Sequence, residues 1–297
     1  MNIGPKIVSG IILGSLSIIA LSGGYVYGHS DGNFLNASIT RSLQPEKKPD
    51  FDTPDDRQSF KEAVEQLNSA VIRHRKDSLL QLKDTFRSWL KDGSLAPYAH
   101  YYVAYCNYRL NTNFAEERDN IDQELTDEGL EHINEAREHE PIRAEALALK
   151  SSLLGLKIAG PFSAMSNGPK ANEAIGRALE IAPNNPRVAM LDAIGAYYKP
   201  SFAGGGMQKS IQGLKEATRL FERSGESGDA QAPSQELITW GRAESYAWLA
   251  KLYLEEEQWD KAREMLLQAV DIRSDYRWVY EELNPALPDS LKLDETS

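Results

Sequence analysis

The sequence predicts an all-α protein assembled from consecutive pairs of helices. From residue 55 onward, apolar residues recur at the spacing of an amphipathic helix. No convincing alternation of apolar and polar residues, the pattern typical of a strand, interrupts this spacing. The 297 residues are 41% hydrophobic and 26% charged, so most of the chain is expected to fold.

Residues 1–28 are predicted to direct the chain out of the cytoplasm. One positive charge, Lys6, precedes an apolar run over 7–21 that only glycine and serine interrupt. As a signal peptide, this run is the hydrophobic region, and small residues suited to cleavage follow it. As a single transmembrane anchor, the 21 residues over 7–27 are long enough to cross the bilayer core. Both alternatives export the rest of the chain from a bacterium-like cell, to the periplasm or to the outer side of the inner membrane.

Residues 29–54 are predicted to form a flexible linker, and residues 55–95 an N-terminal helical segment. The linker ends in a stretch rich in proline and charge that lacks any apolar period. Thr53 and Pro54, followed by two aspartates, have the pattern of a helix start: a capping side chain, a proline and acidic residues in the first turn. Apolar residues then follow helical spacing until Gly93, as one bent helix or as two.

The clearest repeat covers residues 243–272, AESYAWLAKLYLEEEQWDKAREMLLQAVDI. Small residues in both halves let two antiparallel helices approach closely, and large residues fill the seam beside them. The segment resembles a tetratricopeptide repeat (TPR) without gaps. The positions at which that family places its packing residues are occupied here by Tyr246, Leu249, Ala250, Tyr253, Ala262, Leu266 and Ala269. One departure is Ser274, where the family usually has proline.

Three further segments match the second helix of this repeat, over 129–141, 171–183 and, more weakly, 210–222. The resemblance implies a TPR-like superhelix, a solenoid of about four irregular helical hairpins over 96–284, with a polar C-terminal tail over 285–297. The last alanines of the four second helices are 42, 39 and 52 residues apart, against about 34 in the family. The additional residues are expected between helices, at 111–120, 160–169, 199–206 and 223–237.

Four tyrosines form a stripe at helical spacing along the first helix of the first pair. In the resembled family these positions line a concave groove that contacts ligand, so the resemblance implies a surface for an extended peptide. Mixed polar residues occupy the same groove positions in the last pair. The alternative is that the stripe packs against the N-terminal helices over 55–91. The predicted partner-binding residues are Tyr98, Tyr101, Tyr105, Tyr108, Arg109, Glu244, Lys251 and Glu255.

Neither the charge nor the glycine-rich stretch indicates nucleic-acid or nucleotide binding. The formal net charge of −11 repels nucleic acid, so no nucleic-acid partner is expected. The glycines at 204–206 precede Lys209 and Ser210, but a phosphate-binding loop would need glycine at Ala203 and Gln208. We therefore predict a turn between two helices at this place.

Residues that could carry chemistry are few. The single cysteine, Cys106, has no obvious base nearby in sequence and is expected to be a buried structural thiol. His132, Glu135 and His139 lie near one helix face and could touch a divalent metal, but the same stretch also suits a solvated acidic face. We predict no cofactor, no metal and no enzymatic activity.

These observations predict a protein-binding scaffold or adaptor of the bacterial cell envelope, with a protein partner in the TPR-like groove. The predicted binding of a protein partner follows from the functions of proteins with a similar fold. The alternative is a periplasmic helical protein that binds a small ligand or a lipid and serves a transport system, with the long insertions closing a cavity. Gly10 and Gly14 have a spacing that packs membrane helices together, so a homo-oligomer is a further alternative.

Overall fold

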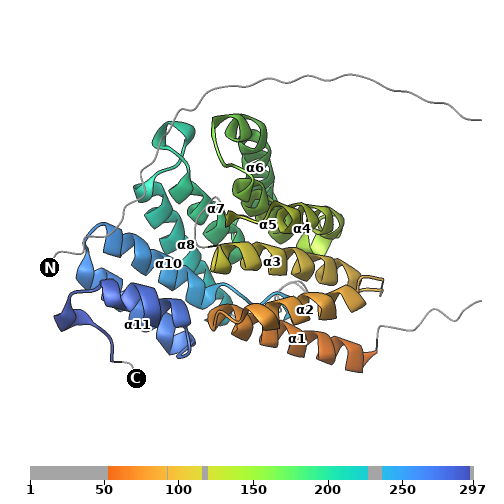
Figure 1. The fold of residues 1–297 in the computed structure, drawn as a ribbon, viewed down its shortest axis with the longest axis horizontal. Helices are drawn as coiled ribbons and strands as arrows, with labels where there is room; N and C mark the ends of the chain where they lie inside the picture. Colours follow the sequence, from red (N-terminus) through yellow and green to blue (C-terminus); the bar gives the residue numbers. More distant parts are fainter. Residues whose placement is uncertain (1–52, 92, 116–119, 227–235, 295–297) are drawn as a thin grey trace, which may run out of the picture. The chain divides into compact units, whose positions relative to one another are not determined.

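The structure, a computed structural model, describes residues 53–91, 93–115, 120–226 and 236–294. These residues form helices that pack as sequential antiparallel pairs (Figure 1), which confirms the predicted all-α class. The pairs are α1 (Pro54–Ile72) with α2 (Lys76–Ser88), α3 (Ala96–Phe114) with α4 (Gln123–Ala136), α5 (Arg143–Leu156) with α6 (Pro161–Ile181), α7 (Pro186–Tyr198) with α8 (Met207–Glu226), and α10 (Arg242–Glu255) with α11 (Trp259–Ile272).

The predicted signal peptide or anchor over 1–28 lies outside the described residues, as does most of the linker. Among the helices that are described, none combines the length and the apolar character needed to cross a membrane. The start of α1 is as predicted: the Thr53 Oγ1 accepts from the Asp56 N–H, and the Asp56 Oδ2 accepts from the Thr53 N–H, both at 3.2 Å. The segment that follows is two helices rather than one, because the chain turns at His74, which has φ of 50°.

The small and large residues of the repeat pattern lie at the helix contacts. Each second helix of the four later pairs buries its matched residues against its own first helix, as close packing of two helices requires. Gly129 of α4 shows how close the helices come, because a Cβ there would lie 3.5 Å from the Cβ of Asn107 on α3 and 3.1 Å from a methyl group of Leu153 on the next helix, α5. The buried residues are Gly129, Ile133, Ala136, Ala171, Ile175, Ala178, Ser210, Leu214, Ala217, Ala262, Leu266 and Ala269.

Helix α6 starts earlier than predicted. The connection expected over 160–169 is mostly helical, because Pro161 is compatible with the first helical position and the Ser163 Oγ accepts from the Gly160 N–H at 2.9 Å. Pro169 lies inside the helix. The first half of α6 extends beyond the core, since its buried side chains all follow that proline: Ala171, Ala174, Ile175 and Ala178.

The glycines at 204–206 form the tight turn predicted between α7 and α8. Gly204 and Gly206 have positive φ values of 81° and 107°, which glycine adopts without strain. The three glycine N–H groups donate to carbonyl oxygens between Ala196 and Ser201 at 2.8–3.1 Å. Because the amides are used inside the turn, they are not available to cradle a phosphate.

The C-terminal residues pack onto the fold instead of forming the polar tail predicted over 285–297. Leu287 and Leu293 are buried, and Asn284 exchanges two hydrogen bonds with the backbone of Leu293, at 2.7 and 3.1 Å. Polar residues outnumber the leucines in this stretch, but Leu287 and Leu293, with the partly buried Leu291, supply enough apolar surface to hold it against the fold, where residues 289–291 contact α11. Residues 295–297 lie outside the described part.

Candidate functional site

The tyrosine stripe of α3 is buried and does not line an open groove. Tyr98, Tyr101, Tyr105 and Tyr108 are at most slightly exposed. Trp240 covers the middle of the stripe: its Nε1 donates to the Tyr101 OH at 3.1 Å, and its ring stacks on Tyr105 with centroids 4.6 Å apart. The groove expected at these residues is therefore filled by the chain itself.

The N-terminal helices contact a different face of α3 from the stripe. Phe60 of α1 and Phe86 of α2 pack on Tyr102, with ring centroids 5.9 and 4.8 Å away. The Tyr102 OH donates to the backbone oxygen of Leu237 at 2.6 Å. The tyrosine stripe is therefore buried, as the alternative interpretation expected. The segment that covers it, however, lies just before α10 and does not come from residues 55–91.

Two buried ion pairs hold the helices around the covered tyrosine stripe together. Arg109 of α3 donates to Glu244 of α10 at 2.6 Å, so two of the predicted partner-binding residues satisfy each other. Arg187 of α7 donates to Glu145 of α5 at 2.7 and 3.0 Å and to the Trp240 oxygen at 3.4 Å. The second and the last of the five pairs, α3–α4 and α10–α11, are thereby joined directly, and the stripe between them is covered.

Lys251 and Glu255, the remaining predicted residues, belong to a surface that is still accessible. We call Tyr197, Tyr198, Trp248 and Trp278 the aromatic cluster. Trp248 of α10 is its centre, with ring centroids 6.1 Å from Tyr197, 6.2 Å from Tyr198 and 5.5 Å from Trp278. The four rings come from α7, α10 and the segment after α11, and each is partly or fully exposed.

Lys251 places a positive charge within this cluster. Its Nζ lies 4.5 Å from the ring centroid of Tyr197 and 5.8 Å from that of Trp248, within the range of a cation–π contact. It also donates to the Tyr197 OH at 3.1 Å and pairs with Glu255. Burial lowers the pKa of Lys251, but Glu255 and Tyr197 raise it by more, so Lys251 is a cation at neutral pH. The aromatic cluster thus combines the apolar faces of aromatic rings with one positive charge whose position is fixed.

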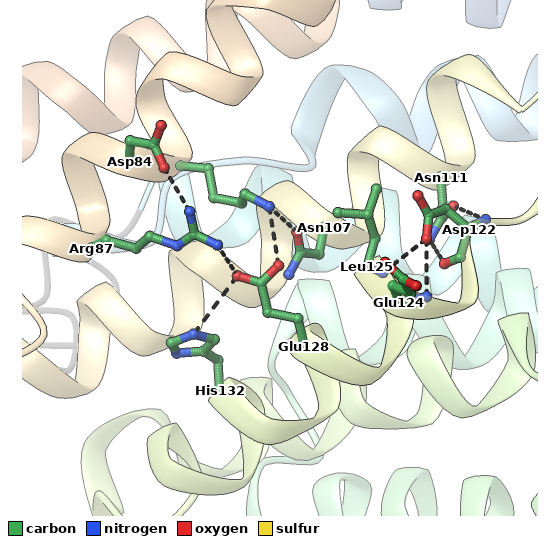
Figure 2. Close-up of polar contacts among 10 residues, drawn as sticks. Asp84, Arg87, Asn107, Asn111, Asp122, Glu124, Leu125, Glu128 and His132 are labelled. Carbon is green, nitrogen blue, oxygen red and sulfur yellow. Dashed lines mark hydrogen bonds and ion pairs between the residues drawn. The ribbon is translucent and has the colours of Figure 1, made fainter.

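A second group of charges lies between α2, α3 and α4 (Figure 2). The Lys83 Nζ donates to Asn107 at 3.0 Å and to Glu128 at 3.1 Å, and Arg87 bridges Glu128 and Asp84. Burial raises the pKa of Glu128, but the hydrogen bonds from Arg87 and Lys83 lower it by more, so the net shift is downward. Each charge has a protein partner, so this group joins three helices and leaves no reactive group pointing at a ligand.

The histidines considered as metal ligands diverge. The His132 Nδ1 lies 3.0 Å from the His100 Nδ1, whereas His139 packs edge-on against Tyr98. Within the described ranges, no three histidine, cysteine or acidic side chains are arranged to hold a metal ion. Cys106 is fully buried, as predicted for a structural thiol, and this burial raises its pKa.

The two best-defined depressions on the described residues lie along the edges of α1 and measure about 410 and 400 Å³. Charged and polar residues contribute to both, so neither is a closed apolar cavity. The first is lined by Thr53, Pro54, Arg57, Ser94 and Leu95, and the second by Lys61, Val64, Glu65, Asn68, Glu236, Leu237, Thr239 and Arg273.

Comparison with known proteins identifies a structural relative. No protein-family model matches the chain, and a search of curated proteins also found no match. Among solved structures, the chain is similar to the HusA haemophore from Porphyromonas gingivalis, with a TM-score of 0.53 and 20% sequence identity. The similarity covers 67% of this chain and 93% of the haemophore chain. At this identity the likeness supports the helical-pair fold and does not establish a function.

Proposed function

We propose that this protein binds a planar aromatic ligand with carboxylate groups, of the haem type, outside the cytoplasm. The observation that carries the proposal is the aromatic cluster around Trp248, with Lys251 against the rings of Trp248 and Tyr197. Flat apolar rings stack on a porphyrin face, and the partly exposed Lys251 ammonium, which pairs with Glu255 in the free protein, would exchange that partner for a ligand carboxylate. Tyr198, which is 58% exposed, adds a phenol oxygen, one of the groups that hold haem iron in proteins, whereas the Tyr197 OH is hydrogen-bonded to Lys251 and Glu255.

The structural likeness to a haemophore supports this proposal over the scaffold predicted from the sequence. Most of the residues expected to contact a protein partner are buried or paired inside the fold. A partner of the cell envelope remains a prediction, and the accessible residues that would serve it, Lys251 and Glu255, belong to the aromatic cluster. Binding a ligand and passing it on requires no catalytic group.

Titration of the full chain with haemin and with iron-free protoporphyrin IX tests the proposal. We expect a shift of the Soret band and quenching of tryptophan fluorescence, since Trp248 and Trp278 would contact the ligand. K251Q should weaken binding about tenfold, equivalent to about 1.4 kcal/mol, through loss of the carboxylate partner.

The matched control is K261Q. Lys261 of α11 also lies over a tyrosine ring, that of Tyr253 at 5.6 Å, but outside the cluster. Absence of any spectral change with either porphyrin would refute the proposed function. Equal affinity of K251Q and K261Q would move the site away from the aromatic cluster.

A further inference from the structure

The most exposed apolar side chains of the described residues lie at the start of α6 and in the turn between α7 and α8. Phe162 and Met165, in the first turns of α6, are 90% and 77% exposed. Phe202, in the turn between α7 and α8, is 94% exposed. Other large apolar residues that are exposed in the described part are 37–58% exposed, so these three stand apart. Exposure of this degree in a folded chain indicates a contact surface.

Both turns are built so that these side chains stay exposed. The first half of α6 buries none of its side chains, and Ser163 holds its start through the Gly160 N–H at 2.9 Å. The turn carrying Phe202 is braced by the three glycine amides, and the Lys209 Nζ donates to the Gly204 oxygen at 2.7 Å. The phenyl rings are therefore presented by ordered backbone.

The two turns occupy equivalent places in consecutive hairpins. One joins α5 to α6 and the other joins α7 to α8, and α7 contacts both α5 and α6. Hairpins stacked with the same sense place their internal turns on one edge. Both turns project toward the top of Figure 1, away from α1 and α2. We call Phe162, Met165 and Phe202 the apolar edge.

The sequence around the apolar edge is rich in lysine and free of acidic residues, whereas the whole chain is acidic; one of these lysines, Lys157, pairs with Asp127 of α4. Residues 146–172 and 193–215 contain lysines at 150, 157, 170, 199, 209 and 215 and neither aspartate nor glutamate, although the chain has a net charge of −11. Lys170 and Lys209, which flank the turns, are exposed. The acidic remainder of the protein repels an anionic surface, so among the described residues we expect this edge to approach one most favourably.

We propose that the apolar edge docks on an anionic lipid bilayer, with Phe162, Met165 and Phe202 inserted at the level of the headgroups and the lysines paired with lipid phosphates. Aromatic and apolar side chains beside lysines are the composition that binds the membrane interface. Rings at the tips of protrusions enter a soft lipid phase directly, whereas the aromatic anchors of protein interfaces fill preformed pockets. The predicted membrane segment over 1–28 would keep such a bilayer within reach. This proposal rests on residues that the proposed porphyrin site does not use.

The test places a polarity-sensitive fluorophore on the full chain through a new cysteine at F202C or, separately, at F162C. Cys106 is buried and stays unlabelled. The control is Q66C on α1, on a different element and exposed. With vesicles of phosphatidylglycerol and phosphatidylethanolamine, we expect a blue shift at 202 and 162 and none at 66. Even if the N-terminal segment attaches every variant to the vesicles, only inserted positions shift.

A second variant tests the charge. K170Q/K209Q should lower the affinity for these vesicles about fivefold for each lysine removed, and pure phosphatidylcholine should give little shift with any variant. An unchanged emission at 202 and 162 with anionic vesicles would overturn the proposal. A shift that needs no vesicles and grows with protein concentration would assign the edge to self-association and also overturn it. Porphyrin binding in solution should survive F162S/F202S, and its loss would identify the edge as the ligand site instead.

Discussion

Removing the carboxylate of Glu244 should destabilise the protein strongly, because it leaves the Arg109 charge buried without its partner. The two side chains are only 10% and 7% exposed, and 2.6 Å separates their charged atoms. Breaking a buried ion pair from one side costs about 3–5 kcal/mol. Arg109 would keep its contacts with the rings of Tyr105 and Tyr108, at 5.8 and 6.0 Å, so we expect the lower end of that range.

The variant E244L tests this by urea and thermal unfolding, followed by circular dichroism at 222 nm. A loss of about 3 kcal/mol corresponds to a melting temperature lower by about 6–12 °C in a unit of this size. The double variant R109M/E244L should recover most of the loss, since apolar replacement of a buried pair is often neutral.

The control E281Q breaks an exposed pair with Arg277 and should change the stability little. A loss of less than about 1 kcal/mol in the free energy of unfolding of E244L, the range of a surface pair, would contradict the prediction. So would an R109M/E244L variant that is no more stable than E244L. Either result would mean that the closure between α3 and α10 does not depend on this ion pair.

The remaining predictions concern the glycine turn and the paired histidines. G205A should lower the melting temperature, because its Cβ would lie 2.3 Å from the Cβ and backbone oxygen of Lys199, whereas G176A in α6 has open space and should not. Burial lowers the pKa of His100 and His132 below 6.5, so the unfolded state binds more protons at mildly acid pH. The free energy of unfolding should therefore fall as the pH drops from about 6.5 through the folded pKa values. H100Q/H132Q should flatten that part of the curve in urea unfolding, and an unchanged slope would contradict the assignment.

The helix pairs could be predicted because their signals are local. The small residues at Ala250 and Ala262, for example, lie within one hairpin and reveal its contact by spacing alone. The early start of α6 was missed because Pro161, Gly168 and Pro169 suggested a connection. Local capping by Ser163 and the tolerance of a helix start for proline outweighed that composition.

The candidate site was only partly predictable. Lys251 and Glu255 could be selected because they occupy groove positions of the repeat in the last helix pair. Trp248, whose ring lies near Lys251, is beside those positions on the same helix. Tyr197 comes from a different pair, so its proximity depends on how hairpins stack. The burial of the tyrosine stripe depends on Trp240, which lies just before α10 and has no place in the repeat pattern. No short-range signal could place that ring on Tyr105.

The joining of the α3–α4 pair to the last pair, α10–α11, also bears on how the protein opens. In a linear stack each hairpin touches only its neighbours, so the ends fray independently. Here hydrogen bonds between residues 135 and 139 positions apart connect α3 to the start of α10. Amide protons in the α3–α4 and α10–α11 hairpins should therefore exchange through nearly global unfolding rather than through local fraying. Such long-range pairing also slows folding, since distant segments must meet before their contacts form.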